Sequence, residues 1–414
     1  MIFLNISLIK SGLSSVLLYF LMIACKKEAA PTPPPPPGGG ETPVVTPVPD
    51  PATATTMGFF LDDWSARTFT APAYTEAAPV TSATANVVTI DASAVLTKIP
   101  LAIFGHNANT WMGPMIVDPG FKTHINNLKP HIIRFPAGSG SDAYFFNQPQ
   151  GVLPPDVPEL IMDKDGILKA PGYWFGKTNY NWQASLDQYY AMLAETRNQG
   201  MITVNYGYAR YGTSADPVAA AAHLAADWVR YDNGRTPYWE IGNETYGDWE
   251  WGYRINQAVN KDGQPEYVTG KLYAQHFAVF ADSMKKAAAE IGKTIYIGAT
   301  MYESATENWQ TNTVKTWNSS MVPELQGRPD FYIVHNYFTP YNENSTAATV
   351  LSAALSVPGK MMSHVKSQIL INGGVLKPVA LTEWNMWARD SKQQVSNISG
   401  LFAVIIQAEA LKNN

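Results

Sequence analysis

Two glutamates close apolar, strand-like segments and are the side chains of this sequence best placed to do chemistry. Residues 239–244 read WEIGNE and end on Glu244, and residues 381–385 read LTEWN and contain Glu383. Two carboxylates carried by different strands suit the cleavage of a glycosidic bond, since one protonates the leaving oxygen while the other attacks the anomeric carbon from about 5–5.5 Å away. This pattern predicts a retaining glycoside hydrolase that works by double displacement, with Glu244 and Glu383 as its catalytic residues.

These glutamates need a scaffold that brings strand ends together, and the sequence indicates one. From about residue 86, short apolar runs alternate with longer amphipathic ones, which is typical of a parallel sheet in an α/β protein. The expected helices include residues 186–197, 216–231, 272–291 and 396–411. The expected strands are residues 101–104, 132–135, 202–206, 238–242, 295–298, 331–335 and 379–382.

The number and spacing of the strands predict a (β/α)8 TIM barrel rather than an open doubly wound sheet, because no glycine-rich dinucleotide motif follows the first strand. No eighth strand follows Glu383, so we expect a barrel that lacks its eighth strand within this chain. Catalytic groups of such barrels lie at the C-terminal ends of the strands. Glu240 precedes Glu244 by four residues and lies roughly 13 Å deeper, so we expect it to be a structural carboxylate with buried partners.

The first 25 residues are typical of a bacterial lipoprotein signal peptide. Lys10 precedes an apolar run at residues 16–24, which is too short to span a membrane in the mature protein, and Cys25 follows it directly. We expect Cys25, the only cysteine of the chain, to be acylated and to anchor the protein to the cell envelope, at the outer membrane or cell surface of a bacterium. A buried structural thiol is the alternative.

Three further segments complete the expected domain organisation. Residues 26–56 form a Pro/Gly-rich tether, with ten prolines between Pro31 and Pro51, which would act as a spacer. Residues 57–95 form a small N-terminal β extension with an accessory strand at 87–90. Residues 96–414 form the catalytic barrel, which is C-terminally incomplete.

Several motifs resemble clan A glycoside hydrolases and, within that clan, glycoside hydrolase family 51, the α-L-arabinofuranosidases. The segments GNETYGDW at 242–249 and EWNMW at 383–387 carry most of the resemblance. RFPAG at 134–138 is similar to the family's motif on strand two, and FGH at 104–106 to its first strand. The resemblance extends from about residue 86 to the end.

The resemblance implies a role for each glutamate and for the residue between the strand and the first of them. Glu244 would be the acid/base and Glu383 the nucleophile, while Asn243 would hydrogen-bond the sugar 2-hydroxyl.

Three other residues are expected around the reacting sugar and Glu383. Glu383 must be ionised to attack, and the permanently charged fork of Arg134 suits that task. Tyr337 follows the strand at 331–335 on the same face as His335, and its hydroxyl is expected to donate to Glu383. For Arg134 the alternative is a structural ion pair, and for His335 it is a hydrogen-bonded core residue.

The sequence departs from the family pattern just after the first expected strand. Asn109 stands where the arabinofuranosidases carry a glutamate that grips the furanose, and Asn107 replaces an aromatic residue. An amide lacks the acceptor pair of a carboxylate. The sugar specificity therefore stays open, and a hexopyranoside or an algal or hemicellulosic polysaccharide is an alternative substrate.

Tryptophans are numerous beside the expected strand ends. Trp249 and Trp384 neighbour the two glutamates, and we expect both to stack on sugar rings. Trp111, Trp251 and Trp387 lie in the same loops. For each of these rings, filling the core is the alternative role, because large barrels also bury aromatic side chains.

Charge and histidine spacing limit the expected partners. The net charge of −5 makes nucleic acid an unexpected partner. The seven histidines show no His-x-x-x-His spacing, so we expect no metal and no cofactor. The expected partners are an oligo- or polysaccharide substrate and a membrane, reached through the lipid on Cys25. Two alternatives stay open: an endo-acting clan A glycanase on plant or algal polysaccharide, and a non-catalytic glycan-binding lipoprotein on a truncated barrel.

Overall fold

The structure is a computed structural model. It describes residues 59–62, 64, 65, 73, 75, 86, 88–91, 96–387 and 391–413. The chain divides into two compact units, of which one comprises residues 56–64 and 99–414 and holds the central sheet. The other comprises residues 1–55 and 65–98.

Several predictions for the N-terminal region fall outside the described residues. They are the signal peptide with its acylated Cys25 and the Pro/Gly-rich tether at 26–56. Among the described residues, Val88, Thr89 and Ile90 carry no strand, so the accessory strand expected there is not formed by them. In the part of the chain that is described, no helix combines the length and the apolar character needed to cross a membrane.

Seven parallel strands form the central sheet, and their order in space follows their order in the sequence. The strands are β1 (Gly105–Asn107), β2 (Ile132–Phe135), β7 (Gln199–Val204), β8 (Tyr238–Ile241), β9 (Tyr296–Thr300), β10 (Phe331–Asn336) and β11 (Val379–Trp384). Parallel neighbours in strict chain order, joined by helices, make a nearly closed barrel. The predicted TIM-barrel class is confirmed, as is the count of seven strands in the central sheet of the described residues.

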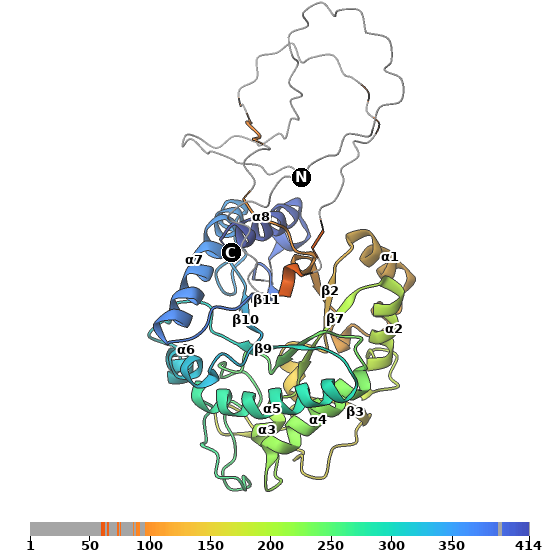
Figure 1. Ribbon diagram of the computed structural model, residues 1–414, viewed down its shortest axis with the longest axis vertical. Coiled ribbons are helices and arrows are strands. Elements are labelled where there is room, and N and C mark those ends of the chain that lie inside the picture. Colours follow the sequence, from red (N-terminus) through yellow and green to blue (C-terminus); the bar gives the residue numbers. More distant parts are fainter. Residues whose placement is uncertain are drawn as a thin grey trace, which may run out of the picture. The chain divides into compact units, whose positions relative to one another are not determined.

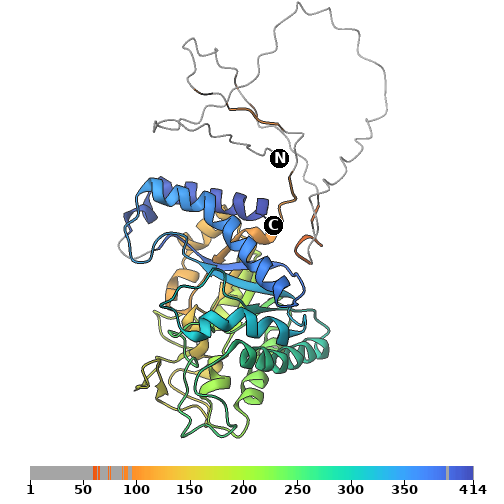
Figure 2. The same cartoon turned by 90° about the vertical axis from the view of Figure 1, so that its left-hand side faces the viewer.

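Helices surround this sheet (Figures 1 and 2). They are α1 (Pro119–Leu128), α2 (Leu186–Thr196), α3 (Gly207–Tyr211), α4 (Pro217–Asp232), α5 (Gly270–Glu290), α6 (Asn312–Leu325), α7 (Ala347–Ile371) and α8 (Asn397–Asn413). Most start where the sequence supplies an N-cap. Ser185 and Gln188 form a capping box at α2, and the Asp216 side chain accepts from the Ala219 N–H just before Pro217 at the start of α4.

The first strand was predicted too early in the chain. Leu101–Ile103 form a short 3-10 helix behind Pro100, and the strand begins only at Gly105. Ala102 of this turn packs on an apolar cluster with Ile132 and Phe331. The apolar run at 101–104 therefore packs against the end of the sheet instead of forming a strand. Its composition alone fits either role.

Two small sheets between β2 and α2 were not predicted. In one, β3 (Tyr144–Pro149) pairs with β6 (Trp174–Lys177). In the other, β4 (Ile161–Met162) pairs with β5 (Leu168–Lys169) as a short hairpin. These strands are brief and carry no clear alternation, so they depend on tertiary contacts instead of local pattern.

A side chain links the first and last strands of the sheet. β1 and β11 are its two edges, and the Asn107 side-chain amide on β1 donates a hydrogen bond to the Thr382 carbonyl on β11, at 3.2 Å. This hydrogen bond ties the edge beside Glu383 to β1.

Residues Phe59–Leu61 cover the N-terminal end of the barrel. The Phe59 ring stacks on Tyr296, the first residue of β9, with centroids 3.8 Å apart, and also contacts Tyr238 and Phe331, the first residues of β8 and β10. Phe60 joins the same cluster. With this end closed by aromatic packing, the C-terminal strand ends are left to form a site.

Replacing Phe59 by alanine should remove this stacking. Because the ring is half-buried, we expect the free energy of unfolding to fall by about 2 kcal/mol in guanidinium titrations. The control is Trp309→Ala, whose ring is 82% exposed and should change stability by less than about 0.5 kcal/mol. Equal stability of F59A and the unmodified protein would contradict this role for residues 59–61.

Candidate active site

Glu244 and Glu383 meet at the C-terminal end of the barrel. Glu383 is the penultimate residue of β11, and Glu244 follows β8 by three residues. An oxygen of one carboxyl group lies within 4.8 Å of an oxygen of the other. Their side chains are 16% and 14% exposed, so both reach solvent at a shared, partly open position. The structure thus brings together the two residues that the sequence singled out.

A tight turn, rather than the strand itself, places Glu244. Gly242 has φ +76°, and a Cβ there would lie 2.6 Å from Thr245 Oγ1 and 2.8 Å from Tyr206 Cβ, so only glycine fits. Glu244 itself has φ +37°, a conformation that costs a non-glycine residue about 1–3 kcal/mol. The surrounding structure holds this glutamate in a strained backbone conformation, which is common where a side chain must be aimed.

Glu383 is held as a carboxylate. Arg134 Nη1 donates to its Oε1 at 2.7 Å, and the Tyr337 hydroxyl donates to its Oε2 at 3.1 Å. Burial alone would raise the pKa of Glu383, but the charges of His335 and Arg134 and these hydrogen bonds outweigh it and lower the pKa to about 2. The expected contacts of Arg134 and Tyr337 with Glu383 are confirmed.

Arg134 divides its guanidinium among three partners. Besides Glu383, it donates through Nε to Glu240 Oε2 at 2.7 Å and through Nη2 to Asn243 Oδ1 at 2.8 Å. Glu240 is fully buried and also accepts from the Thr203 hydroxyl at 2.7 Å. The prediction of a structural carboxylate with buried partners is confirmed, and Arg134 connects that carboxylate to the site.

Asn243 is more deeply embedded than the sequence indicated. It is 1% exposed, its Oδ1 accepts from Arg134, and its Nδ2 donates to Glu250 Oε1 at 2.9 Å. Glu250 also accepts from the Ser139 hydroxyl at 2.7 Å. Asn243 therefore bridges Arg134 and the loop after β8, a role that was not predicted.

Glu244 is paired with a histidine. His335 Nδ1 lies 3.0 Å from Glu244 Oε1, and His335 Nε2 lies 3.0 Å from the Thr382 hydroxyl. Burial lowers the pKa of His335, but the charge of Glu383 and the hydrogen bond and charge of Glu244 overcome this and raise it above 6.5. The Nδ1–Oε1 contact needs a proton between its two atoms, so His335 and Glu244 share one.

Trp249 completes the surroundings of Glu244. Its indole Nε1 donates to Glu244 Oε2 at 2.7 Å, and the residue is 54% exposed to solvent. An exposed ring fixed by a hydrogen bond to one of the two acids is available to contact a ligand. The structure thus places Trp249 where the sequence predicted it, beside Glu244.

Trp384 requires a correction. The strand β11 continues through Trp384, so alternation turns this ring to the face opposite Glu383. There it packs with Phe402 of α8, at 6.1 Å between ring centroids, beside a cluster that includes Phe338 and Met386. The sugar contact expected for Trp384 is therefore wrong, because its ring belongs to the packing between the barrel and α8.

Asn109 lies just beyond β1 and is half-buried. Its backbone carbonyl accepts from the Met112 N–H, which starts the turn at Thr110–Ile116. Among the hydrogen bonds of the described residues, none joins Asn109 to Glu244 or Glu383. The structure leaves its predicted contact with a sugar untested.

Two buried carboxyl groups near the site were missed in the sequence. Glu303 accepts from the Asn336 side-chain amide at 3.2 Å, and burial, with the charge of Glu244 adding to it, raises its pKa to about 7. Burial likewise raises the pKa of Glu250 well above its usual range, and the nearby charges of Asp142 and Glu244 add to this effect. Glu303 follows β9 by three residues, as Glu244 follows β8, and that spacing could have indicated it.

The two candidate catalytic glutamates and His335 also form a group of possible metal ligands. Single ligand atoms of Glu244, His335 and Glu383 lie within 4.8 Å of one another. However, the Arg134 guanidinium already lies 2.7 Å from Glu383, and a fixed positive charge at that distance opposes a divalent ion. The arrangement suits a pair of acids with an arginine partner better than a metal site.

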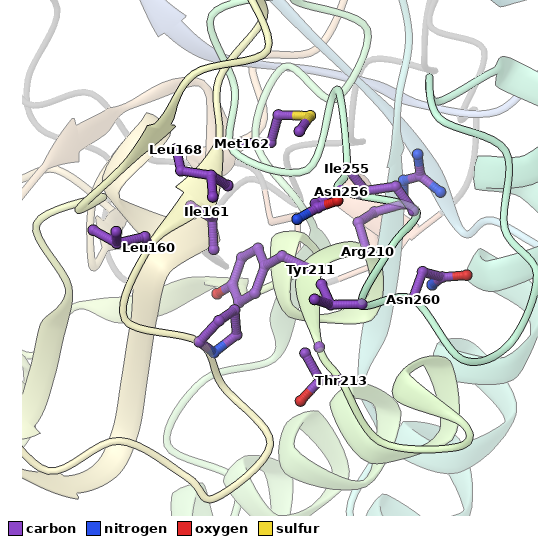
Figure 3. A pocket seen from close by; sticks show the side chains of 13 residues that line it. Leu160, Ile161, Met162, Leu168, Arg210, Tyr211, Thr213, Ile255, Asn256 and Asn260 are labelled. Carbon is purple, nitrogen blue, oxygen red and sulfur yellow. The ribbon is translucent and has the colours of Figure 1, made fainter.

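A separate apolar pocket lies beside the β4–β5 hairpin (Figure 3). Ile161 and Leu168 of the hairpin line it, together with Tyr211 and Ile255. The guanidinium of Arg210, which lines the pocket, donates its hydrogen bonds to Gln264 and to backbone carbonyls. The pocket shares no lining residue with the glutamate site and offers few polar groups to orient a ligand.

Comparison with known proteins finds similarity only among solved structures. No protein-family model and no curated protein matches the chain. Solved structures similar to it include a family 51 α-L-arabinofuranosidase from Bifidobacterium longum, with 15% sequence identity and a TM-score of 0.45. The alignment covers 76% of this chain and 65% of the arabinofuranosidase chain. The GH51 arabinofuranosidase from Xanthomonas axonopodis pv. citri is 17% identical with a TM-score of 0.47, and covers 75% and 65%.

A third similar structure is a family 39 glycoside hydrolase from Bacteroides cellulosilyticus, 11% identical with a TM-score of 0.34, covering 79% of this chain and 70% of its own. The chain spans just under two thirds of the length of the two arabinofuranosidases, 65% in each case. The function of this protein must therefore be inferred from the geometry of the site itself.

The shared proton at His335 makes stability depend on pH. A histidine with a raised pKa contributes stability that is fully present below pH 6.5 and is lost as the pH rises through its folded pKa. His335→Asn should therefore destabilise the protein more at pH 5.5 than at pH 9, as measured by guanidinium unfolding at both.

His364 of α7 supplies the matched control. Burial lowers its pKa, so His364→Asn should show the opposite trend, with any gain in stability confined to acid pH. A loss of stability in His335→Asn that is equal at both pH values would contradict the shared proton.

Proposed function

We propose that this protein is a retaining glycoside hydrolase that cleaves glycosides derived from polysaccharides by double displacement, and that it is α-L-arabinofuranosidase-like. The observation that supports this most is the separation of the two acids, with an oxygen of Glu244 within 4.8 Å of an oxygen of Glu383. Retaining enzymes place their carboxyl groups about 5–5.5 Å apart, whereas inverting enzymes leave about 6.5–9.5 Å for a water.

In the first step, Glu383 acts as the nucleophile. Its carboxylate, held by Arg134 and Tyr337, attacks the anomeric carbon and forms an ester bond with the sugar. The bond to the leaving oxygen breaks at the same time, and that oxygen takes the proton from Glu244. Glu244 enters this step as a carboxylic acid, and the negative charge left on it is stabilised by the neighbouring His335 and Trp249 donors.

In the second step, a water molecule replaces the leaving group. Glu244, now a carboxylate, removes a proton from this water while the oxygen attacks the anomeric carbon. The ester bond to Glu383 breaks, and its electron pair returns to the carboxylate that Arg134 neutralises. Both acids end in the state in which they began, Glu244 protonated and Glu383 ionised.

Five other residues are proposed to contact the sugar. Asn243 keeps one amide N–H beyond its bond to Glu250 and can offer it to the sugar 2-hydroxyl. Trp249 presents an exposed ring beside Glu244. Tyr337 and His335 flank the carboxylates, and Asn109 lies at the end of β1, where it would help to select the sugar.

Substitution of each acid tests this mechanism. Glu383→Gln cannot form the ester and should lose activity on all nitrophenyl glycosides of a panel that includes the α-L-arabinofuranoside. Glu244→Gln should depend on the leaving group: it should lose about 10²–10⁴-fold in kcat/KM with a poor leaving group and much less with one that needs no proton.

Glu290→Gln is the control, because this glutamate pairs with Arg230 on the outside of the barrel, and it should leave kcat/KM unchanged. Undiminished turnover by Glu383→Gln would reject the nucleophile. Absence of turnover by the unmodified protein on the panel and on plant and algal polysaccharides would favour the non-catalytic glycan-binding alternative.

We also propose that Cys25 is acylated and anchors the protein to a bacterial envelope, at the outer membrane or cell surface. The position of Cys25 directly after the apolar run at 16–24 supports this. In a bacterial host, the unmodified protein should sediment with membranes and Cys25→Ser should not, with mass spectrometry of the N-terminal peptide reporting the lipid. Membrane sedimentation of Cys25→Ser equal to that of the unmodified protein would refute the anchor.

A further inference from the structure

Four aromatic rings form a continuous row on the loops after β1 and around β6. The row consists of Trp111, Trp174, Trp182 and Tyr180. Trp174 lies 5.7 Å from Trp111 and 5.9 Å from Trp182 between ring centroids, and Tyr180 stacks on Trp182 at 5.4 Å. Trp111, Trp182 and Tyr180 are 46%, 50% and 45% exposed, while Trp174 is half-buried between them. We call these four residues the aromatic row.

The aromatic row begins beside the two acids. The turn after β2 lies between the row and Glu383, because one of its glycines is close to Glu383 and another is close to Trp174 and Trp111. A Cβ on Gly138 would lie 2.7 Å from Glu383 Oε1, and a Cβ on Gly140 would lie 3.2 Å from Trp174 Nε1 and 3.3 Å from the Trp111 ring. The row therefore adjoins the position of the reacting sugar through a single turn of backbone.

The backbone beneath the aromatic row is fixed. Thr110 and Ala184 exchange two hydrogen bonds: the Ala184 N–H donates to the Thr110 carbonyl at 2.7 Å, and the Thr110 hydroxyl donates to the Ala184 carbonyl at 3.0 Å. Gln183, which is 2% exposed, donates to the Phe175 carbonyl at 3.3 Å. Gly113, at φ +52°, lies against the Trp182 backbone, where any Cβ would clash.

Such fixed, exposed rings serve a ligand better than they serve the fold. Single exposed apolar side chains are ordinary on protein surfaces, but three neighbouring exposed rings on a hydrogen-bonded backbone cost hydration without adding to the core. A ligand that covered them would bury aromatic area at reduced cost in ordering, because the backbone that carries the rings is already held in place.

We propose that the aromatic row binds successive sugar units of a linear oligosaccharide or polysaccharide, beyond the sugar that reacts at Glu383. This inference rests on the proposed function and names its substrate class. The C–H faces of sugar rings are apolar and stack on aromatic faces, and a row of rings fits a chain of sugars better than a lone glycoside. The substrate is therefore a chain that extends from the acids along the loops after β1 and β6.

The test compares substrates of different length on the full chain. Trp111→Ala and Trp182→Ala, alone and together, are assayed on nitrophenyl α-L-arabinofuranoside and on arabino- and xylo-oligosaccharides of increasing length. The short aryl glycoside should be cleaved as by the unmodified protein. KM for the longer oligosaccharides should rise roughly tenfold in the double variant, which corresponds to the stacking of one to two rings. Trp309→Ala, an exposed ring outside the row, should change neither.

Binding separates failure of this inference from failure of the proposed function. Affinity electrophoresis in gels containing linear arabinan or xylan needs no turnover, so it tests the row even if no substrate is cleaved. Retardation of the unmodified protein that is lost in the double variant supports the row. Retardation and KM that are the same in both proteins, or a loss of activity on the short glycoside, would overturn it.

Discussion

The buried guanidinium of Arg134 is the interaction on which the site depends most. It is 3% exposed and donates to Glu240, Asn243 and Glu383, which belong to two distant stretches of the chain, residues 240–243 and residue 383. A buried cation is costly unless it is paired and hydrogen-bonded on all sides. Here each partner also needs the cation, since Glu240 is fully buried and Glu383 must remain ionised. The fork geometry of arginine can meet all three, which a lysine ammonium could not do with the same rigidity.

The remaining constraints aim the second acid and hold the edge of the sheet. Gly242 and the strained backbone of Glu244 orient the Glu244 side chain. Its Oε1 contacts His335 Nδ1 and its Oε2 accepts a hydrogen bond from Trp249. Asn107 joins β1 to β11 one residue before Glu383. The separation of the acids is therefore set by a buried ion pair, a turn that only glycine allows, one inter-strand hydrogen bond and the two contacts of Glu244.

Much of the barrel and of its acid pair could be predicted from the sequence, for a physical reason. Strands buried on both faces are short apolar runs, and the polar residues just after them must lie at the C-terminal end of a parallel barrel. This logic located Glu244, Glu383 and Arg134. It failed for Trp384, because the strand runs two residues further than its apolar core and alternation then turns the ring outward.

The parts that could not be predicted depend on contacts between distant segments. The hydrogen bonds of Asn243 with Arg134 and Glu250 were not predicted, because nothing local in the sequence indicates them. The aromatic row likewise arises only when the loop after β1 meets the strand β6. Burial also decides which acids have a raised pKa, as for Glu303, and burial is a property of the folded chain.

The anomeric configuration of the first sugar released tests the central claim most directly. Proton NMR during the early hydrolysis of a cleaved nitrophenyl glycoside, before mutarotation, reports that configuration. A spacing that leaves no room for water between Glu244 and Glu383 predicts a product with the same configuration as the substrate. A first product of inverted configuration would mean that water attacks the anomeric carbon directly, and it would contradict double displacement by these two acids.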